Sequence, residues 1–169
     1  MEIENASLAD VDEILRLYDL ARIYQQERFP VLWPYFESSL IEQEINEKRQ
    51  WKMVTNNDIA CIWTTTKSDP LIWEERNANP SVYIHRIATN PVFRGGNLVV
   101  EIVAWAKKYA AENGLQYVRL DTVGENEKLI AYYQKCGFTF LGLFTLKNTE
   151  GLPQHYHNAD VSLFELKVG

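Results

Sequence analysis

Four consecutive residues in the middle of the chain, Arg94-Gly95-Gly96-Asn97, stand directly before a strongly amphipathic segment. The first turn of a helix leaves backbone N–H groups without partners, and the aligned peptide dipoles make that end partly positive. The two glycines allow close backbone approach to a ligand, and Arg94 adds a positive charge. The pattern indicates a site for a phosphate or diphosphate. A plain strand–helix turn fits the same spacing about equally well, and both interpretations stay open.

The segments on either side of this turn must position it. Residues 82–89 form an apolar, β-branched run, which predicts a strand that ends before Pro91, since proline has no backbone N–H. Apolar spacing from Leu98 predicts a helix that continues to Gly114, where glycine takes the left-handed conformation. The chemistry is therefore expected in a strand–turn–helix unit.

Length and composition limit the class of protein. The 169 residues, 46% of them hydrophobic, fit one folded domain over residues 1–169. The net charge of −6 disfavours nucleic acid or an anionic membrane as the main partner, and it suits a cationic substrate.

Cysteine usage and hydropathy bear on the compartment. Cys61 and Cys136 belong to no C-x-x-C pair, so neither a disulfide framework nor a metal site is expected, and a reducing cytoplasm is the default. The first ten residues do not resemble a signal peptide. No apolar run approaches the length of a membrane span.

The rest of the chain is punctuated by turn signals. Ser7 and Asp10 form a capping-box pattern, and Asn56-Asn57-Asp58 is a strong hairpin signal. Periodicity predicts strands at 1–6, 51–55, 59–66, 117–122, 138–146 and 161–167, helices at 7–27, 36–48 and from 125 or 126 to 135, and loops at 67–81 and 147–160.

Three pieces of sequence, in order, resemble the GNAT superfamily of N-acetyltransferases, and the likeness covers nearly the whole chain. The first is the strand HRIAT followed by Asn90-Pro91 and FRGGNL, similar to the family's pattern of Arg or Gln, two residues, Gly, one residue, then Gly or Ala. The second is LDT with Asn126 and, seven residues later, Tyr133. The third is residues 133–138, YQKCGF, similar to the family's Tyr-x-x-x-Gly-Phe. The order and spacing of the three pieces, taken together, are specific to this family.

One departure from the family pattern falls in the turn. Aligned from Arg94, the family's glycine becomes Asn97 and its Gly-or-Ala becomes Val99. Asparagine tolerates a left-handed backbone better than other non-glycine residues, whereas Val99 is bulkier where the cofactor would approach. Cofactor affinity is the property that this departure puts in question.

The resemblance implies an α+β fold with α/β/α layers: a mixed, mostly antiparallel sheet of six to seven strands, a splayed parallel pair (83–89 and 117–122) at its centre, and about four helices. It implies acetyl-CoA as donor and a primary amine of a small molecule or peptide as acceptor, and it allows a homodimer. The cofactor-binding residues that it implies are Ile87, Ala88 and Thr89 for the pantetheine, Arg94, Gly95, Gly96, Asn97, Leu98 and Val99 for the diphosphate, and Asn126 and Tyr133.

Acetyl transfer needs a base for the amine and an acid for the leaving thiolate. Tyr133 matches the family's general acid, and its alternative is an aromatic residue packed under the sheet, a role that Tyr132 could equally fill. His85 is the best side chain for the base, because histidine titrates near pH ~6.5. A histidine satisfied by one hydrogen bond is the equal alternative, and Glu74, Glu75 or a water chain are rivals.

Two further groups carry weaker signals. His155 and His157 lack additional ligands for a metal and are expected in a solvated loop. The aromatic loop at residues 29–35, with Phe36, could line an acceptor pocket by binding cations on aromatic faces, or could only pack the first two helices together.

Two other functions remain open on sequence alone. Asn97 and Val99 also fit a non-catalytic acyl-CoA-binding or regulatory domain. A protein N-terminal or lysine acetyltransferase would differ only in its acceptor.

Overall fold

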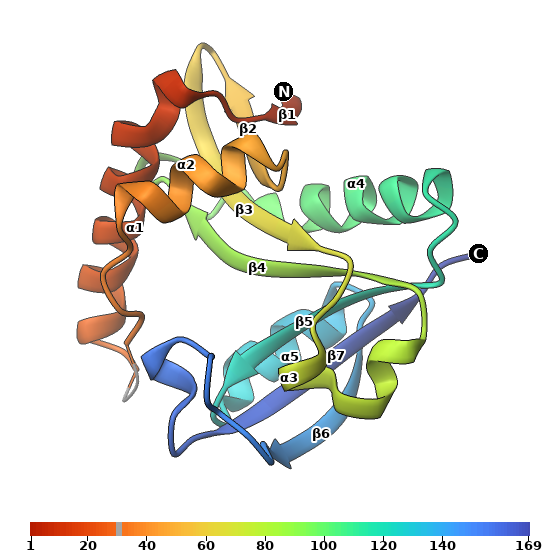
Figure 1. The fold of residues 1–169 in the computed structure, drawn as a ribbon. Helices are drawn as coiled ribbons and strands as arrows, with labels where there is room; N and C mark the ends of the chain where they lie inside the picture. The colour runs from red at the N-terminus through yellow and green to blue at the C-terminus, as the bar shows by residue number, and fades with distance from the viewer. Residues whose placement is uncertain (30–31) are drawn as a thin grey trace. The chain divides into compact units, whose positions relative to one another are not determined.

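A computed structural model describes residues 1–29 and 32–169 (Figure 1). The chain divides into two compact units, each described here by itself: Met1–Thr65 with His85–Leu98, and Thr66–Ile84 with Val99–Gly169. The sequence predicts a single domain over residues 1–169, and that remains a prediction.

Seven strands form one sheet in the order β1-β2-β3-β4-β5-β7-β6. The strands are β1 Glu2–Asn5, β2 Gln50–Thr55, β3 Asp58–Thr66, β4 Ser81–Thr89, β5 Tyr117–Val123, β6 Thr139–Thr145 and β7 Asp160–Lys167. The helices in the described residues are α1 Val11–Gln26, α2 Ser38–Asn46, α3 Pro70–Trp73, α4 Leu98–Glu112 and α5 Glu127–Lys135, with short 3-10 turns at Leu8–Asp10, Glu74–Ala78, Pro91–Phe93 and Gln154–Tyr156.

The expected mixed sheet with a central parallel pair is confirmed. β4 and β5 are parallel, and their pairing runs from Ser81 opposite Tyr117 to Ile84 opposite Leu120. The pairings of β1 with β2, β2 with β3, β5 with β7 and β6 with β7 are antiparallel. This register covers four residues of each strand, Ser81–Ile84 and Tyr117–Leu120.

The turn between β2 and β3 follows directly from its residue types. Thr55 lies opposite Asp58, so the hairpin loop has two residues, Asn56 with φ 52° and Asn57 with φ 66°. Left-handed backbone at both positions matches the twist of the flanking strands, and asparagine tolerates it. The hairpin prediction is confirmed.

The segment at residues 67–81 was expected to be a loop, and that prediction is wrong. It contains α3 and a 3-10 turn. Pro70 occupies the first turn of α3, where its missing N–H removes no helical bond, and Ile72 and Trp73 are buried. With this short helix, residues 1–29 and 32–169 contain five helices where about four were expected.

Each unit has its own apolar core. In the first unit the buried face of α1, including Ile14, Leu17 and Tyr18, packs with Ile41 of α2 and Ile62 of β3. In the second unit Ile72 and Trp73 of α3 form a buried cluster with Tyr83, Tyr156, Val161 and Leu163. None of the helices in the described ranges is long and apolar enough to cross a membrane.

Candidate active site

Strand β4 carries an irregular backbone at Arg86. Its φ of 52° lies in the left-handed region, which L-residues inside a strand rarely adopt. The guanidinium is ion-paired with Glu44 of α2 and lies 4.8 Å from the ring centre of Phe36. Burial alone would lower the pKa of Arg86, but the neighbouring Tyr18 and Glu44 raise it, so the guanidinium remains charged. Buried partners therefore hold the residue that follows His85 in an unusual conformation.

The turn after β4 is anchored by Asn90, the residue before Pro91 in the first of the three sequence motifs. Its N–H donates to the carbonyl of Ala60 at 2.9 Å, and its Nδ2 donates to the carbonyl of Ile59 at 3.0 Å. Its side-chain oxygen accepts from the N–H of Val92 at 3.2 Å. Asn90 is only 6% exposed, so these bonds fix the turn to β3.

The expected anion cradle is exposed and has the backbone that its residue types suggest. Arg94, Gly95, Gly96 and Asn97 are all exposed to solvent. Gly95 has φ 90° and Asn97 has φ 57°, the left-handed region that glycine and asparagine tolerate. A Cβ on Gly96 would lie 3.1 Å from the carbonyl oxygen of Phe93, closer than most such contacts. At Gly95, by contrast, no described atom beyond the chain neighbours lies within 4 Å of where a Cβ would stand, so this side of the turn has room for a phosphate group.

Not every amide of the turn is available. The N–H groups of Arg94 and Gly96 donate to the carbonyls of Pro91 and Phe93, at 3.2 Å and 3.1 Å. Leu98 and Val99 are the first two residues of α4, where N–H groups lack intrahelical acceptors. The turn still fits a diphosphate, but fewer backbone N–H groups are available to it than residues 94–99 contain.

The three β4 residues expected beside the pantetheine have different surroundings. Ala88 is 2% exposed and packs in the core of the first unit, and Ile87 is half-buried. The Thr89 hydroxyl lies 3.7 Å from the Cys61 sulfur, and burial raises the pKa of Cys61 to about 11.

In the second unit, Tyr133 of α5 is fixed by aromatic packing. Its ring centre is 5.1 Å from that of Phe164 and 6.0 Å from that of Phe138, and the residue is 9% exposed. Tyr132, its neighbour, is half-buried. The packed environment named as the alternative is thus present at Tyr133 itself, and it holds the phenol in one orientation.

Asn126 caps α5. Its side-chain oxygen accepts the N–H of Leu129 at 3.0 Å, and the helix ends before Gly137 with φ 106°, as expected. The capping role given as its alternative is therefore present. A bond from its amide NH2 to a cofactor remains compatible with that cap.

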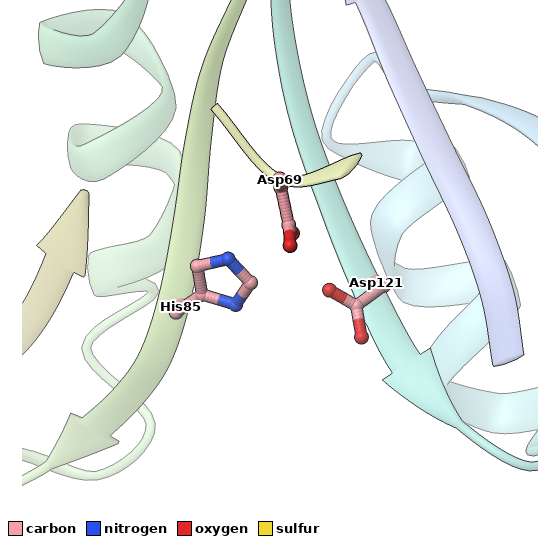
Figure 2. A group of neighbouring side chains, drawn as sticks. All are labelled: Asp69, His85 and Asp121. Atoms are coloured by element: carbon pink, nitrogen blue, oxygen red, sulfur yellow. The ribbon is translucent and has the colours of Figure 1, made fainter. Parts of the chain in front are cut away.

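Sequence reasoning missed a pair of carboxylates in the second unit. Asp69, just before α3, and Asp121, on β5, each offer an oxygen within 4.8 Å of the other, and both residues are half-buried (Figure 2). The Tyr156 hydroxyl donates to Oδ2 of Asp121 at 2.8 Å. Asp121 directly follows Leu120, the last β5 residue paired with β4. The only signals in the sequence were the Asp before a proline and the Asp of LDT.

His85, the candidate base, follows Ile84 on β4 and is labelled in Figure 2. It is half-buried and belongs to the first compact unit. Its backbone carbonyl accepts a hydrogen bond from Thr64 Oγ1 at 3.3 Å. Glu74 is half-buried, whereas Glu75 is exposed and paired with Lys147 at 3.3 Å. His157 is exposed, as expected of a solvated loop. His155 is half-buried instead, with its ring tilted by 40° against that of Tyr156 and the ring centres 4.3 Å apart.

The aromatic loop packs helices, one of the two roles considered for it. Trp33 and Phe36 contact Tyr18 of α1, with ring centres 6.1 Å and 4.9 Å from it. Tyr35 is exposed, with the Arg22 guanidinium 3.5 Å from its ring centre. Residues 30 and 31 of this loop lie outside the described ranges.

Comparison with known proteins agrees with this architecture. The model of the acetyltransferase (GNAT) family matches residues 16–138, and the chain belongs to that family. A curated relative, the uncharacterised N-acetyltransferase YesJ of Bacillus subtilis, is 29% identical over 79 residues, which is 44% of this chain and 41% of the relative. The match therefore spans less than half of that relative's length.

Solved structures share the fold at low identity. A GNAT-family acetyltransferase from Listeria monocytogenes superposes with a TM-score of 0.79 at 23% identity, covering 99% of this chain and 94% of that one. The protein yncA from Salmonella typhimurium, solved with its cofactor acetyl-CoA, gives a TM-score of 0.71 at 14% identity, covering 100% of this chain and 94% of that one.

Proposed function

We propose that the chain is an N-acetyltransferase that moves an acetyl group from acetyl-CoA to a primary amine. The observation that carries this proposal is the open, glycine-lined turn between β4 and α4, in a chain of the GNAT family. Amides at a helix N-terminus bind phosphate without further help. Gly95, Leu98 and Val99 would supply most of the donors, and Arg94 the charge.

Acetyl-CoA supplies an activated acyl carbon, to which the amine nitrogen bonds as the carbon–sulfur bond breaks. One proton must leave the amine, and one must reach the sulfur. A backbone N–H near Ile87 or Ala88 would stabilise the carbonyl oxygen as charge develops on it, and the left-handed Arg86 just before them sets how those amides are directed.

Tyr133 would donate the proton to the leaving sulfur. A phenol of pKa ~10 is a weaker acid than a thiol of pKa ~8.5, so proton transfer to the free thiolate is uphill by about 2 kcal/mol. The phenol therefore helps most by a hydrogen bond to the sulfur as the carbon–sulfur bond breaks. The packing of its ring on Phe164 and Phe138 keeps the hydroxyl from rotating away, which is what a positioned acid requires.

His85 or a water chain would accept the proton of the amine. The Asp69–Asp121 pair adds a second source of negative charge in the unit that contains Tyr133. Two carboxylates with oxygens within 4.8 Å of each other favour a cation between them or a shared proton. We infer that the acceptor approaches as a cationic amine, in agreement with the net charge of −6.

The fold alone does not select the acceptor. Neighbours of similar fold are named as a spermidine N-acetyltransferase and a ribosomal-protein-alanine N-acetyltransferase. Small-molecule and peptide amines, including protein N-termini and lysines, therefore both belong in the test. Two free thiols also suit a reducing, cytoplasmic location, and a homodimer is compatible with the proposal.

A non-catalytic acyl-CoA-binding domain is the second candidate, favoured by the packed environment of Tyr133 and by Val99 in the turn. Titration calorimetry with acetyl-CoA tests the part that both candidates share. Binding is expected in the wild type and at least tenfold weaker in Gly96→Ala, whose new Cβ crowds the Phe93 carbonyl. Absence of binding at hundreds of micromolar would refute both candidates.

A further inference from the structure

Tyr24, on α1, carries two arginine side chains on one ring. The Cζ atom of Arg94 lies 4.1 Å from the ring centre, and the Cζ atom of Arg28 lies 3.9 Å from it. All three residues belong to the first compact unit. The two guanidinium groups are therefore no farther apart than the sum of these distances, and one of them begins the exposed turn described above.

This arrangement concentrates positive charge in an acidic chain. Within residues 1–29 and 32–169, Arg94 has no carboxylate partner. Arg28 pairs only with its neighbour Glu27 at 3.2 Å, and 47% and 71% of the two side chains are exposed. An exposed ion pair of this kind is weak, so Glu27 offsets little of the positive charge of the two arginines.

Arg28 also has a structural role, which leaves most of its donors unused. Its Nη1 donates to the carbonyl of Tyr24 at 3.3 Å and to Glu27 Oε2 at 3.2 Å, and a cation suits the end of α1. Both bonds use the same nitrogen. The donors of Nε and Nη2 have no partner in the described part of the chain, and a guanidinium edge of this kind fits two phosphate oxygens.

We propose that Arg28 and Arg94, held on Tyr24, form a subsite for a phosphomonoester, the ribose 3′-phosphate of a coenzyme A donor. The inference rests on the proposed function, which assigns the diphosphate to the neighbouring turn. Coenzyme A carries one further phosphate beyond that diphosphate, a dianion near neutral pH. Arg94 lies at the junction of the turn and the stack, so a single ligand would reach both.

The test compares coenzyme A with 3′-dephospho-coenzyme A by titration calorimetry on the full chain. Wild type is expected to bind coenzyme A about tenfold or more tightly, the size of one or two charged hydrogen bonds. Arg28→Gln should reduce that ratio to about one while leaving the affinity for the dephospho compound unchanged. Tyr24→Leu, which removes the shared ring, should also reduce the ratio.

Arg16→Gln is the matched control, because it removes the same charge from α1. Arg16 is 53% exposed and pairs with Glu13 at 2.6 Å, and the ratio should stay at its wild-type value. Equal wild-type affinities for the two compounds would overturn the subsite and leave the proposed function intact. An equal loss of both affinities in Arg28→Gln would also overturn it and would place Arg28 on the diphosphate. If neither compound binds, the subsite and the proposed function fail together.

Discussion

Glu44 of α2 accepts a charged hydrogen bond from Arg86, the residue of β4 whose backbone is left-handed. The Glu44 side chain is 5% exposed, and Arg49 lies 3.8 Å from its other oxygen. This buried carboxylate lies between two arginines, and it pairs with the Arg86 side chain at the point where the strand backbone turns to present it. The pair thus links the first helices of the chain to the irregular strand.

Glu44→Ala should lower the free energy of unfolding by about 3–5 kcal/mol, since it leaves the Arg86 charge buried without its partner. Urea denaturation measures this. Glu47→Ala, which removes an acid that is 44% exposed and also paired with Arg49, should change the free energy by less than about 1 kcal/mol. Replacing Glu44 with Leu and Arg86 with Met together should recover much of the loss. Equal effects of the two alanine variants would refute a special role for the pair.

Tyr133→Phe should lower kcat by roughly 10²-fold or more while leaving the KM for acetyl-CoA nearly unchanged, because only proton donation to the sulfur is lost. The phenyl ring keeps the packing against Phe138 and Phe164. Steady-state thiol release measures both constants, and Tyr132→Phe is the control. Unchanged turnover in Tyr133→Phe would remove the general-acid role.

His85→Gln should lower kcat most at low pH, and the loss should shrink as the pH rises toward the pKa of the amine, ~10.4. The free amine then needs no base. A pH–rate profile of wild type and variant provides the comparison. A loss of the same size at every pH would assign His85 to packing.

Cys136 should react with iodoacetamide before Cys61 in the native protein. Burial raises the pKa of Cys61 to about 11, so at pH 8 only about a thousandth of it is thiolate, and the residue is fully buried. Burial also raises the pKa of the half-buried Cys136, so its rate should keep increasing between pH 7 and 9. Intact mass after timed quenching should show one adduct, and two after denaturation; native labelling of Cys61 at an equal rate would contradict this.

Local chemistry explains what could be predicted from the sequence. Asn56 and Asn57 specify their turn by themselves, and the left-handed conformation of Asn97 follows from its residue type. α3 was missed although its signal, an aspartate followed by Pro70, was present, because four residues give no helical period.

Long-range pairing explains what could not be predicted. Glu44 and Arg86 are 42 residues apart, and nothing in the strand pattern marks an arginine for a left-handed backbone. Asp69, just before α3, and Asp121, on β5, come from segments about 50 residues apart. The two arginines on the Tyr24 ring likewise come from separate segments of the chain. Such pairs depend on tertiary structure, which single-residue patterns do not encode.

Release of free thiol from acetyl-CoA across a panel of amines, with spermidine, free amino acids and a peptide bearing an N-terminal alanine among them, tests the central claim most directly. We expect amine-dependent thiol release with at least one cationic amine, and mass spectrometry should find that amine heavier by one acetyl group. Tight binding of acetyl-CoA with no amine-dependent release from any member of the panel would contradict the transferase assignment and leave an acyl-CoA-binding domain.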